Sequence, residues 1–87
     1  MNVGFTPRGW SDYLTWVGDP LHERVNTLIE DARRHPFTGL GKPEPLRGPL
    51  QGWWSRRITQ EHRLVYRIEG SGEAQQITIA RCRLHYR

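Results

Sequence analysis

The sequence has little sulfur and few histidines. Cys82 is the single cysteine, so no intramolecular disulfide can form. The four histidines are scattered without the spacing of zinc ligands, and they are His22, His35, His62 and His85. We therefore expect a protein that folds and works without a disulfide, a metal or another cofactor.

Long apolar runs are also missing. No stretch approaches the roughly 20 residues of a membrane span, and the first ten residues, MNVGFTPRGW, lack the charged and apolar regions of a signal peptide. These features predict a cytoplasmic protein with no membrane association.

Aromatic residues are well represented for the length. The chain has 87 residues, with four Trp, three Tyr and two Phe. Large aromatic side chains supply most of the apolar area that a small core needs, and a domain of this size buries roughly 60 to 70% of its unfolded surface. The sequence predicts a single domain over residues 1–87, with room for one site.

Positive charge is concentrated in the second half. Residues 42–87 carry nine basic residues against four acidic ones, a net charge of +5, and twelve of the thirteen basic residues in the chain are Arg. The planar guanidinium suits phosphate and stacks on bases, so this pattern favours nucleic acid as a partner. Codon bias toward Arg is the alternative explanation.

The first half predicts a strand and two helices. Residues 3–5 alternate as a short strand, and Thr6-Pro7 resembles an N-cap followed by Pro in the first turn. An apolar stripe then follows at helical spacing, consisting of Trp10, Tyr13, Leu14 and Val17. Gly18 is expected to end this helix, and Asp19-Pro20 to begin the second. The second helix has an apolar face made of Leu21, Val25, Leu28, Ile29 and Ala32.

The second half predicts a long loop followed by strands. Residues 35–52 are rich in Pro and Gly, which excludes a helix or a central strand there. Three strand patterns follow, WWSRRI, HRLVYRIE and QQITIARCRLHY, and residues 70–72 mark the last turn. The order β-α-α-loop-β-β-β predicts an α+β domain with two helices on one face of a mainly antiparallel sheet. Arg-rich positions of the last three strands are expected to line the other face, as an open polar surface.

The hairpin between SRRIT and HRLVY has two possible registers. A turn centred on Gln60 would place Arg57 opposite Arg63 and Trp54 opposite Tyr66, and the opposed like charges would suggest an anion between them. A two-residue turn would instead place Arg57 opposite Leu64. In either register, both Arg could simply be solvated or paired with nearby Glu.

Glu44 lies between two prolines in the stretch GKPEPLRG. Pro43 and Pro45 restrict the backbone and bias Lys42 and Glu44 toward extended conformations. A carboxylate held in this way suits a general base, because little entropy is lost when it is fixed against a substrate. The alternative is that the prolines only stiffen a loop and Glu44 pairs with Lys42 or Arg47.

His85 is third from the C-terminus, in RLHYR. A terminal His is usually only solvated. Together with two or more Arg and one positioned carboxylate, however, it completes the set of groups needed for metal-free cleavage of RNA by attack of the ribose 2′-hydroxyl.

Three motifs in order resemble a known family. GKPEPL, WSRRIT followed by EHRLVY, and the terminal pattern C-R-x-H-Y are similar to the YoeB-type toxins of the RelE/ParE superfamily, and the resemblance covers essentially the whole chain. It implies a microbial-ribonuclease-like α+β fold and a toxin that cleaves translated messenger RNA at the ribosomal A site.

The resemblance also implies roles for individual residues. Glu44 would be the general base, Arg63 the phosphate-stabilising residue and His85 the general acid. The supporting or RNA-binding residues would be Arg47, Arg56, Arg57 and Tyr86. The family commonly has Lys at the position of Arg47, and here Arg87 follows the Tyr that usually ends the chain.

The partners implied by the resemblance are a YefM-type antitoxin, the ribosome and messenger RNA. Operator DNA would be bound only through the antitoxin, and the sequence leaves homodimer formation open. Trp53 and Trp54 are candidates for a protein contact or for core packing. Two other functions are compatible with the same residues: a non-catalytic module that binds RNA or the ribosome, and an operon co-repressor without cleavage activity.

Overall fold

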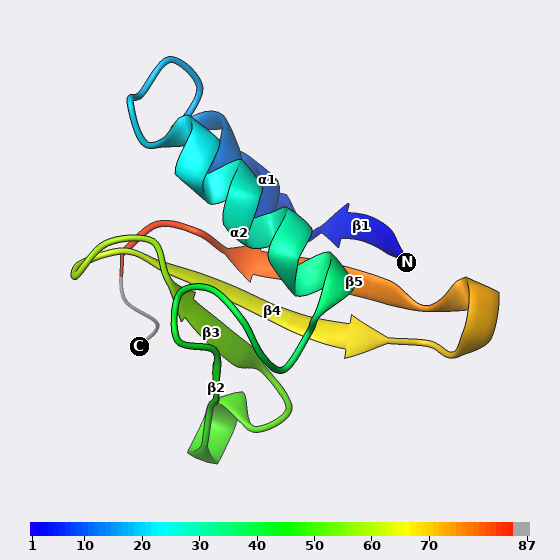
Figure 1. Cartoon of the computed structure of the whole chain (residues 1–87). Helices are drawn as coiled ribbons and strands as arrows, with labels where there is room; N and C mark the ends of the chain where they lie inside the picture. Colours follow the sequence, from blue (N-terminus) through cyan, green and yellow to red (C-terminus); the bar gives the residue numbers. More distant parts are fainter. Residues whose placement is uncertain (85–87) are drawn as a thin grey trace.

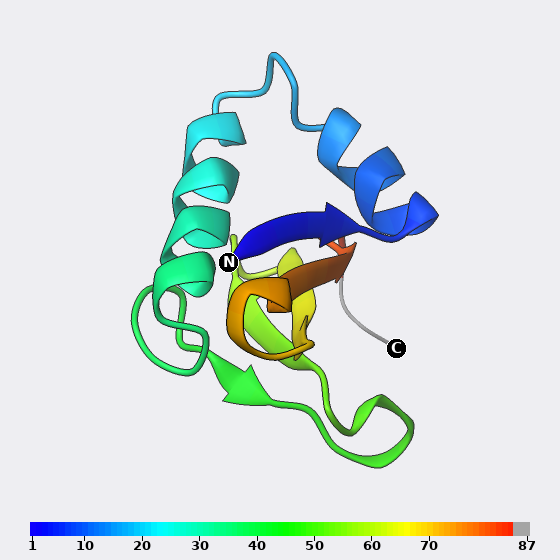
Figure 2. The same ribbon diagram turned by 90° about the vertical axis from the view of Figure 1, so that its right-hand side faces the viewer.

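The computed structural model describes residues 1–84. Two α-helices lie on one side of a five-stranded sheet whose strand order is β1-β5-β4-β3-β2 (Figure 1 and Figure 2). The elements are β1 Asn2–Phe5, α1 Pro7–Leu14, α2 His22–Arg34, β2 Glu44–Pro45, η1 Gly48–Leu50, β3 Trp54–Arg57, β4 Arg63–Glu69, η2 Gly72–Ala74 and β5 Gln76–Arg81. The predicted α+β class and element order are confirmed, with one additional strand, β2.

The sheet is mixed. Strands β2, β3, β4 and β5 pair in antiparallel fashion, whereas β1 pairs parallel to β5 at the other edge. β1 can run parallel because α1 and α2 lie between it and the rest of the sheet in the sequence. The two-residue strand β2 forms inside the Pro-rich loop at the opposite edge, where Pro45 can be tolerated because an edge strand leaves one row of N–H groups unpaired.

The first helix begins as predicted and ends earlier than predicted. Thr6 is the N-cap and its side chain accepts a 3.0 Å hydrogen bond from the Gly9 N–H. Gly9 packs so closely on β5 that a Cβ atom there would overlap the Ile79 carbonyl. Helix α1 ends at Leu14, and the chain then tightens into successive turns up to the glycine predicted to end the helix.

The apolar stripe of this region does not face the core as a whole. The tighter turns after Leu14 have about three residues per turn instead of 3.6, so they turn Trp16 toward the core and Val17 away from it. Trp16 is 1% exposed and lies in the core, whereas Trp10, Leu14 and Val17 are 49%, 49% and 59% exposed. Tyr13 is the one predicted stripe residue that packs against the core.

The second helix agrees with its predicted apolar face. Its residues Val25, Leu28, Ile29 and Ala32 are buried, and they pack with residues of strands β4 and β5, namely Leu64, Tyr66, Ile77 and Ile79. The helix begins at His22, three residues after the predicted cap, although the Asp19 carboxylate does accept a 2.8 Å hydrogen bond from the Leu21 N–H. No helix in the described part of the chain is long and apolar enough to cross a membrane.

Candidate active site

The register of the sheet brings three of the predicted site residues, Glu44, Arg57 and Arg63, to one face. Arg57 lies opposite Arg63, and Glu44 lies opposite Ser55, which is two residues before Arg57 on the same strand. Residues two apart on a strand share a face, so Glu44, Arg57 and Arg63 all belong to the face turned away from the helices, here called the helix-free face. Neighbouring strands are spaced by about 4.8 Å, so β2 and β4, which lie on either side of β3, are roughly 10 Å apart. Long side chains from both strands can therefore reach one phosphodiester.

The helix-free face is less open than predicted. Arg57 and Arg67 are exposed on it, but Ser55 and Val65 are 2% exposed and Arg63 is 9% exposed. The prediction of an open surface lined by the Arg-rich positions of three strands is therefore correct only in part. The exposed charged residues of this face are Glu44 of β2, Arg57 of β3 and Arg67 of β4.

Glu44 is held in an extended strand, as its flanking prolines predict. On one side the Arg57 N–H donates to the Gly41 carbonyl at 2.7 Å, and on the other the Leu46 N–H donates to the Trp53 carbonyl at 2.9 Å. Leu46 is buried and anchors the segment, whereas Glu44 itself is exposed. Lys42 departs from the extended conformation predicted for it, with a φ angle of +53°.

Arg63 is a buried cation held by backbone carbonyls. Its Nη1 donates to the carbonyl oxygens of Thr59 at 2.6 Å, Gln60 at 2.8 Å and His62 at 3.3 Å. Of the two registers that the sequence left open, the structure has the one with Arg57 opposite Arg63. Because these carbonyls offset the charge of Arg63, the opposed pair does not by itself require an anion between its members.

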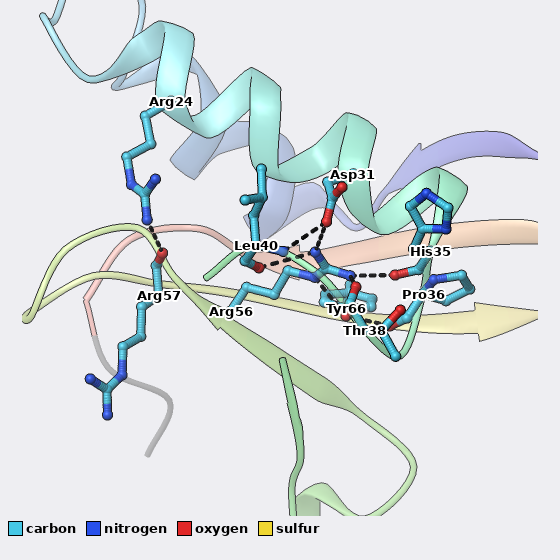
Figure 3. A network of polar contacts seen from close by, with 9 residues as sticks. All are labelled: Arg24, Asp31, His35, Pro36, Thr38, Leu40, Arg56, Arg57 and Tyr66. Carbon is cyan, nitrogen blue, oxygen red and sulfur yellow. Dashed lines mark hydrogen bonds and ion pairs between the residues drawn. The ribbon is translucent and has the colours of Figure 1, made fainter. Parts of the chain in front are cut away.

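Arg56 and Arg57 point to opposite sides of β3 (Figure 3). The Arg56 side chain is 0% exposed and points toward α2, where it forms an ion pair with Asp31. It also donates to Tyr66 Oη at 3.0 Å and to the carbonyls of His35, Thr38 and Leu40. A side chain with no exposed surface cannot contact RNA, so of the two roles predicted for Arg56, direct contact and support, only support is compatible with its position.

The cluster around Arg56 holds the loop that leads to Glu44. Three of the carbonyls bound by Arg56 belong to residues 35–40, which precede β2. The Leu40 N–H and the Arg56 guanidinium both stabilise the Asp31 carboxylate and hold its pKa below the ordinary value. Burial raises the pKa of Tyr66, whose hydroxyl donates to the Pro36 carbonyl. Sequence reasoning missed Asp31 because its partner Arg56 is 25 residues away in the chain.

Arg47 and the two tryptophans surround β2. An open depression of about 420 Å³ is lined by Glu44, Pro45, Leu46 and Arg47, and a neighbouring one of about 430 Å³ includes Trp53 and Trp54. Both tryptophans are half-buried: the Arg67 guanidinium lies 4.7 Å from the ring centroid of Trp53, and Phe37 lies 4.8 Å from that of Trp54.

Two of the predicted site residues, His85 and Tyr86, lie outside the described residues. The structure describes the chain up to Leu84, and it places that residue beside the hairpin of Arg63, because the Arg63 N–H donates to the Leu84 carbonyl at 3.1 Å. Among residues 1–84, no three His, Cys, Asp or Glu side chains are grouped so that they could hold a metal. Burial raises the pKa of the Cys82 thiol to about 12, which keeps it protonated and unreactive at neutral pH.

Comparison with known proteins gives consistent matches over nearly the whole chain. Residues 5–86 match the family model described as YoeB-like toxin of bacterial type II toxin-antitoxin system. Toxin YoeB of Escherichia coli K12 is 47% identical over 88 residues, covering 99% of this chain and 100% of that protein. Toxin YoeB of Streptomyces coelicolor has the same identity and coverage.

Solved structures give the same result. A YoeB/ParE toxin from Agrobacterium tumefaciens has a TM-score of 0.92 at 50% identity, covering 99% of this chain and 100% of the other. YoeB in a YoeB-YefM complex from Staphylococcus aureus has a TM-score of 0.84 at 36% identity, covering 99% and 98%. The YoeB dimer from the same organism has a TM-score of 0.83 at the same identity and coverage.

Proposed function

The chain belongs to the YoeB-like toxins of bacterial type II toxin-antitoxin systems, and from this membership we propose that it is a metal-independent endoribonuclease that cleaves translated messenger RNA. The observation that carries the proposal is the sheet register, which brings Glu44, Arg57 and Arg63 to one end of the helix-free face. A carboxylate and two guanidiniums near one another are suited to phosphodiester chemistry, because one group can accept a proton while the others stabilise negative charge.

The proposed reaction is an internal transfer at phosphorus. Glu44 accepts the proton of the ribose 2′-hydroxyl, and the 2′-oxygen attacks the adjacent phosphorus. Arg63, assisted by Arg57, stabilises the charge that develops on the phosphoryl oxygens. The bond to the 5′-oxygen breaks as His85 protonates that oxygen, which leaves a 2′,3′-cyclic phosphate and a 5′-hydroxyl end. The base and the acid are each expected to contribute about 10² to 10⁴-fold to the rate.

Four further residues have supporting roles in this proposal. Arg47 lines the same depression as Glu44 and would contact the RNA backbone, while Tyr86 would orient or stack on a base. Arg56 would act indirectly, because its hydrogen bonds hold the loop before β2. Exposed Arg57 would provide the direct phosphate contact on β3.

We propose three partners in the bacterial cytoplasm: a YefM-type antitoxin, the ribosome with its A site, and messenger RNA. The Staphylococcus aureus YoeB-YefM complex supports the first of these by similarity. Operator DNA would be reached only through the antitoxin. The exposed apolar residues Trp10, Leu14 and Val17 are suited to a protein contact. The YoeB dimer from Staphylococcus aureus supports a second copy of this chain as one partner for this surface.

The decisive experiment maps the 5′ ends of messenger RNA after a brief pulse of expression. The parent chain should produce discrete cuts inside translated codons. Glu44→Gln and His85→Gln should each reduce cutting by at least about 10²-fold. The matched controls are Glu73→Gln and His35→Gln. Both residues are exposed, and neither side chain has a role in the proposed site, so both variants should cleave like the parent.

Other outcomes would identify a different function. Intact messages in the presence of the parent chain would exclude the nuclease. Growth inhibition that survives Glu44→Gln and His85→Gln but is lost in Arg57→Ala would indicate a non-catalytic module that binds RNA or the ribosome. Antitoxin binding without either effect would indicate a co-repressor.

A further inference from the structure

We propose that His62 is a positioning residue that anchors the C-terminal segment of the active site. Its Nδ1 atom accepts a 2.8 Å hydrogen bond from the Leu84 N–H, and Leu84 is covalently followed by His85, the proposed general acid. The inference rests on the proposed function for the role of His85. The anchor itself is made entirely by described residues.

Leu84 is held by its backbone and not by its side chain. Its N–H donates to His62, and its carbonyl accepts a 3.1 Å hydrogen bond from the Arg63 N–H. The side chain is 56% exposed, and the backbone has a φ angle of +61°, in a region that Leu rarely occupies. An unfavourable backbone conformation persists only where its surroundings impose it, so these two hydrogen bonds define the place of Leu84.

His62 is itself held in one orientation. Its ring meets the ring of Trp16 edge to face, with 5.1 Å between centroids. The Trp16 indole N–H donates to the Cys82 carbonyl at 2.7 Å, and the Arg83 guanidinium lies 4.0 Å from the Trp16 ring centroid. The buried Trp16 therefore contacts His62 on one side and residues 82 and 83 on the other. A single cluster aligns three consecutive residues before His85.

The backbone of the hairpin ties this anchor to Arg63. The His62 N–H donates to the Thr59 hydroxyl at 3.1 Å, and the His62 carbonyl accepts from the Ile58 N–H and from the Arg63 guanidinium. The turn that fixes the proposed phosphate-stabilising residue thus also fixes His62. Terminal residues are usually poorly ordered unless specific contacts hold them in place. Holding an exposed residue such as Leu84 buries little apolar surface and so adds little stability. The geometry therefore points to a role in the site.

The acceptor role requires a specific state of the imidazole. Nδ1 can accept the Leu84 N–H only when it carries no proton, so the ring proton must be on Nε2. An Asn at this position can present its Oδ1 in place of Nδ1, because a side-chain carbonyl is also an acceptor. A Phe can preserve the ring contact with Trp16 but has no acceptor. The two substitutions separate hydrogen bonding from packing.

The test compares His62→Asn with His62→Phe in steady-state cleavage of messenger RNA on programmed ribosomes. His62→Phe should lower kcat by about 10- to 100-fold, the range caused by small displacements of a catalytic group, with KM changed less than about threefold. His62→Asn should retain kcat within about fivefold of the parent. Equal losses in the two variants, or full activity in His62→Phe, would overturn the proposal. Circular dichroism and thermal melts verify that both variants are folded.

A double variant tests whether His62 acts through His85. If it does, adding His62→Phe to His85→Ala should cause little further loss, because the acid is already absent. A full additional 10- to 100-fold loss would contradict the proposal. If His85→Ala cleaves like the parent, the proposed general acid is wrong and the role of His62 in catalysis fails with it.

The anchor can be measured without any catalysis. In uniformly ¹⁵N-labelled protein, a scalar coupling across the N–H···N hydrogen bond should connect the Leu84 amide nitrogen with Nδ1 of His62. Its absence, or a proton on Nδ1 at pH 8, would overturn the anchor even if RNA cleavage is confirmed. Its presence together with inactive parent protein would instead place the failure in the proposed function.

Discussion

Arg56 and Arg57 are identical residues in adjacent positions, yet the fold gives them opposite environments. Arg56 is fully buried beneath α2, with an ion pair to Asp31 and hydrogen bonds to Tyr66 and the loop before β2. Arg57 is exposed on the helix-free face, opposite Arg63. The alternation of side chains along β3 causes this division. Charge in a sequence therefore does not identify a nucleic-acid contact until the face of the strand is known.

The largest expected effect comes from removing the buried member of the pair. Arg56→Ala should lower the free energy of unfolding by about 3 to 5 kcal/mol, because it leaves Asp31 and several loop carbonyls without their partner. Urea denaturation followed by fluorescence measures this loss. Arg57→Ala is the matched control on the same strand. Equal stability of the two variants would show that burial does not distinguish these arginines.

The exposed member should affect RNA cleavage and not stability. Arg57→Ala should change the free energy of unfolding by no more than about 0.5 kcal/mol and reduce the cleavage rate by about 10²-fold. The slope of log affinity against log salt concentration for single-stranded RNA should decrease by about 0.7, the value for one lost phosphate contact. Unchanged cleavage and salt dependence would show that Arg57 does not contact phosphate.

A smaller effect should appear in the pH dependence of the free energy of unfolding, because the ionisation of Asp31 stabilises the fold. The pKa of Asp31 is lowered in the folded chain by the Leu40 N–H and by Arg56. A lowered pKa means that the carboxylate stabilises the fold at pH values above its unfolded pKa of about 3.8. This contribution is lost as the pH falls through the lower, folded pKa.

Asp31→Asn should remove this part of the acid sensitivity. At pH 7 it should cost about 1 to 2 kcal/mol of unfolding free energy, less than Arg56→Ala, because the Asn oxygen can still accept one hydrogen bond. Urea denaturation at pH 7 and below pH 4 compares the two chains. Identical acid dependence in parent and variant would show that the cluster around Arg56 does not depend on this charge.

Residues with local signals were predicted best. The Thr6-Pro7 cap and the apolar face of α2 agree with the structure, since each depends on neighbours a few residues apart. The register of the β3–β4 hairpin also matched one of the two predicted alternatives. That register places Arg57 and Arg63 on the same face of the sheet.

The sequence predictions fail at three places. Helical spacing put Trp10, Tyr13, Leu14 and Val17 in one apolar stripe, but Tyr13 alone of these four packs against the core, and Trp16 enters the core where the chain tightens after Leu14. Lys42 has a positive φ angle where Pro43 predicted an extended one. His62 received no role because the residue that its side chain binds, Leu84, is 22 positions away.

The sequence alone determined the class of fold, the extended presentation of Glu44 and the family to which the chain belongs, because local periodicity, backbone restriction and ordered motifs do not depend on packing. Tertiary structure decided which of two adjacent arginines is buried, which aromatic residue of the first helical region fills the core, and how Leu84 is held beside Arg63. The physical reason is that burial and hydrogen-bond partners depend on contacts between residues far apart in the chain. A sequence pattern gives the order of the side chains along the chain but not the distances between them in the folded protein.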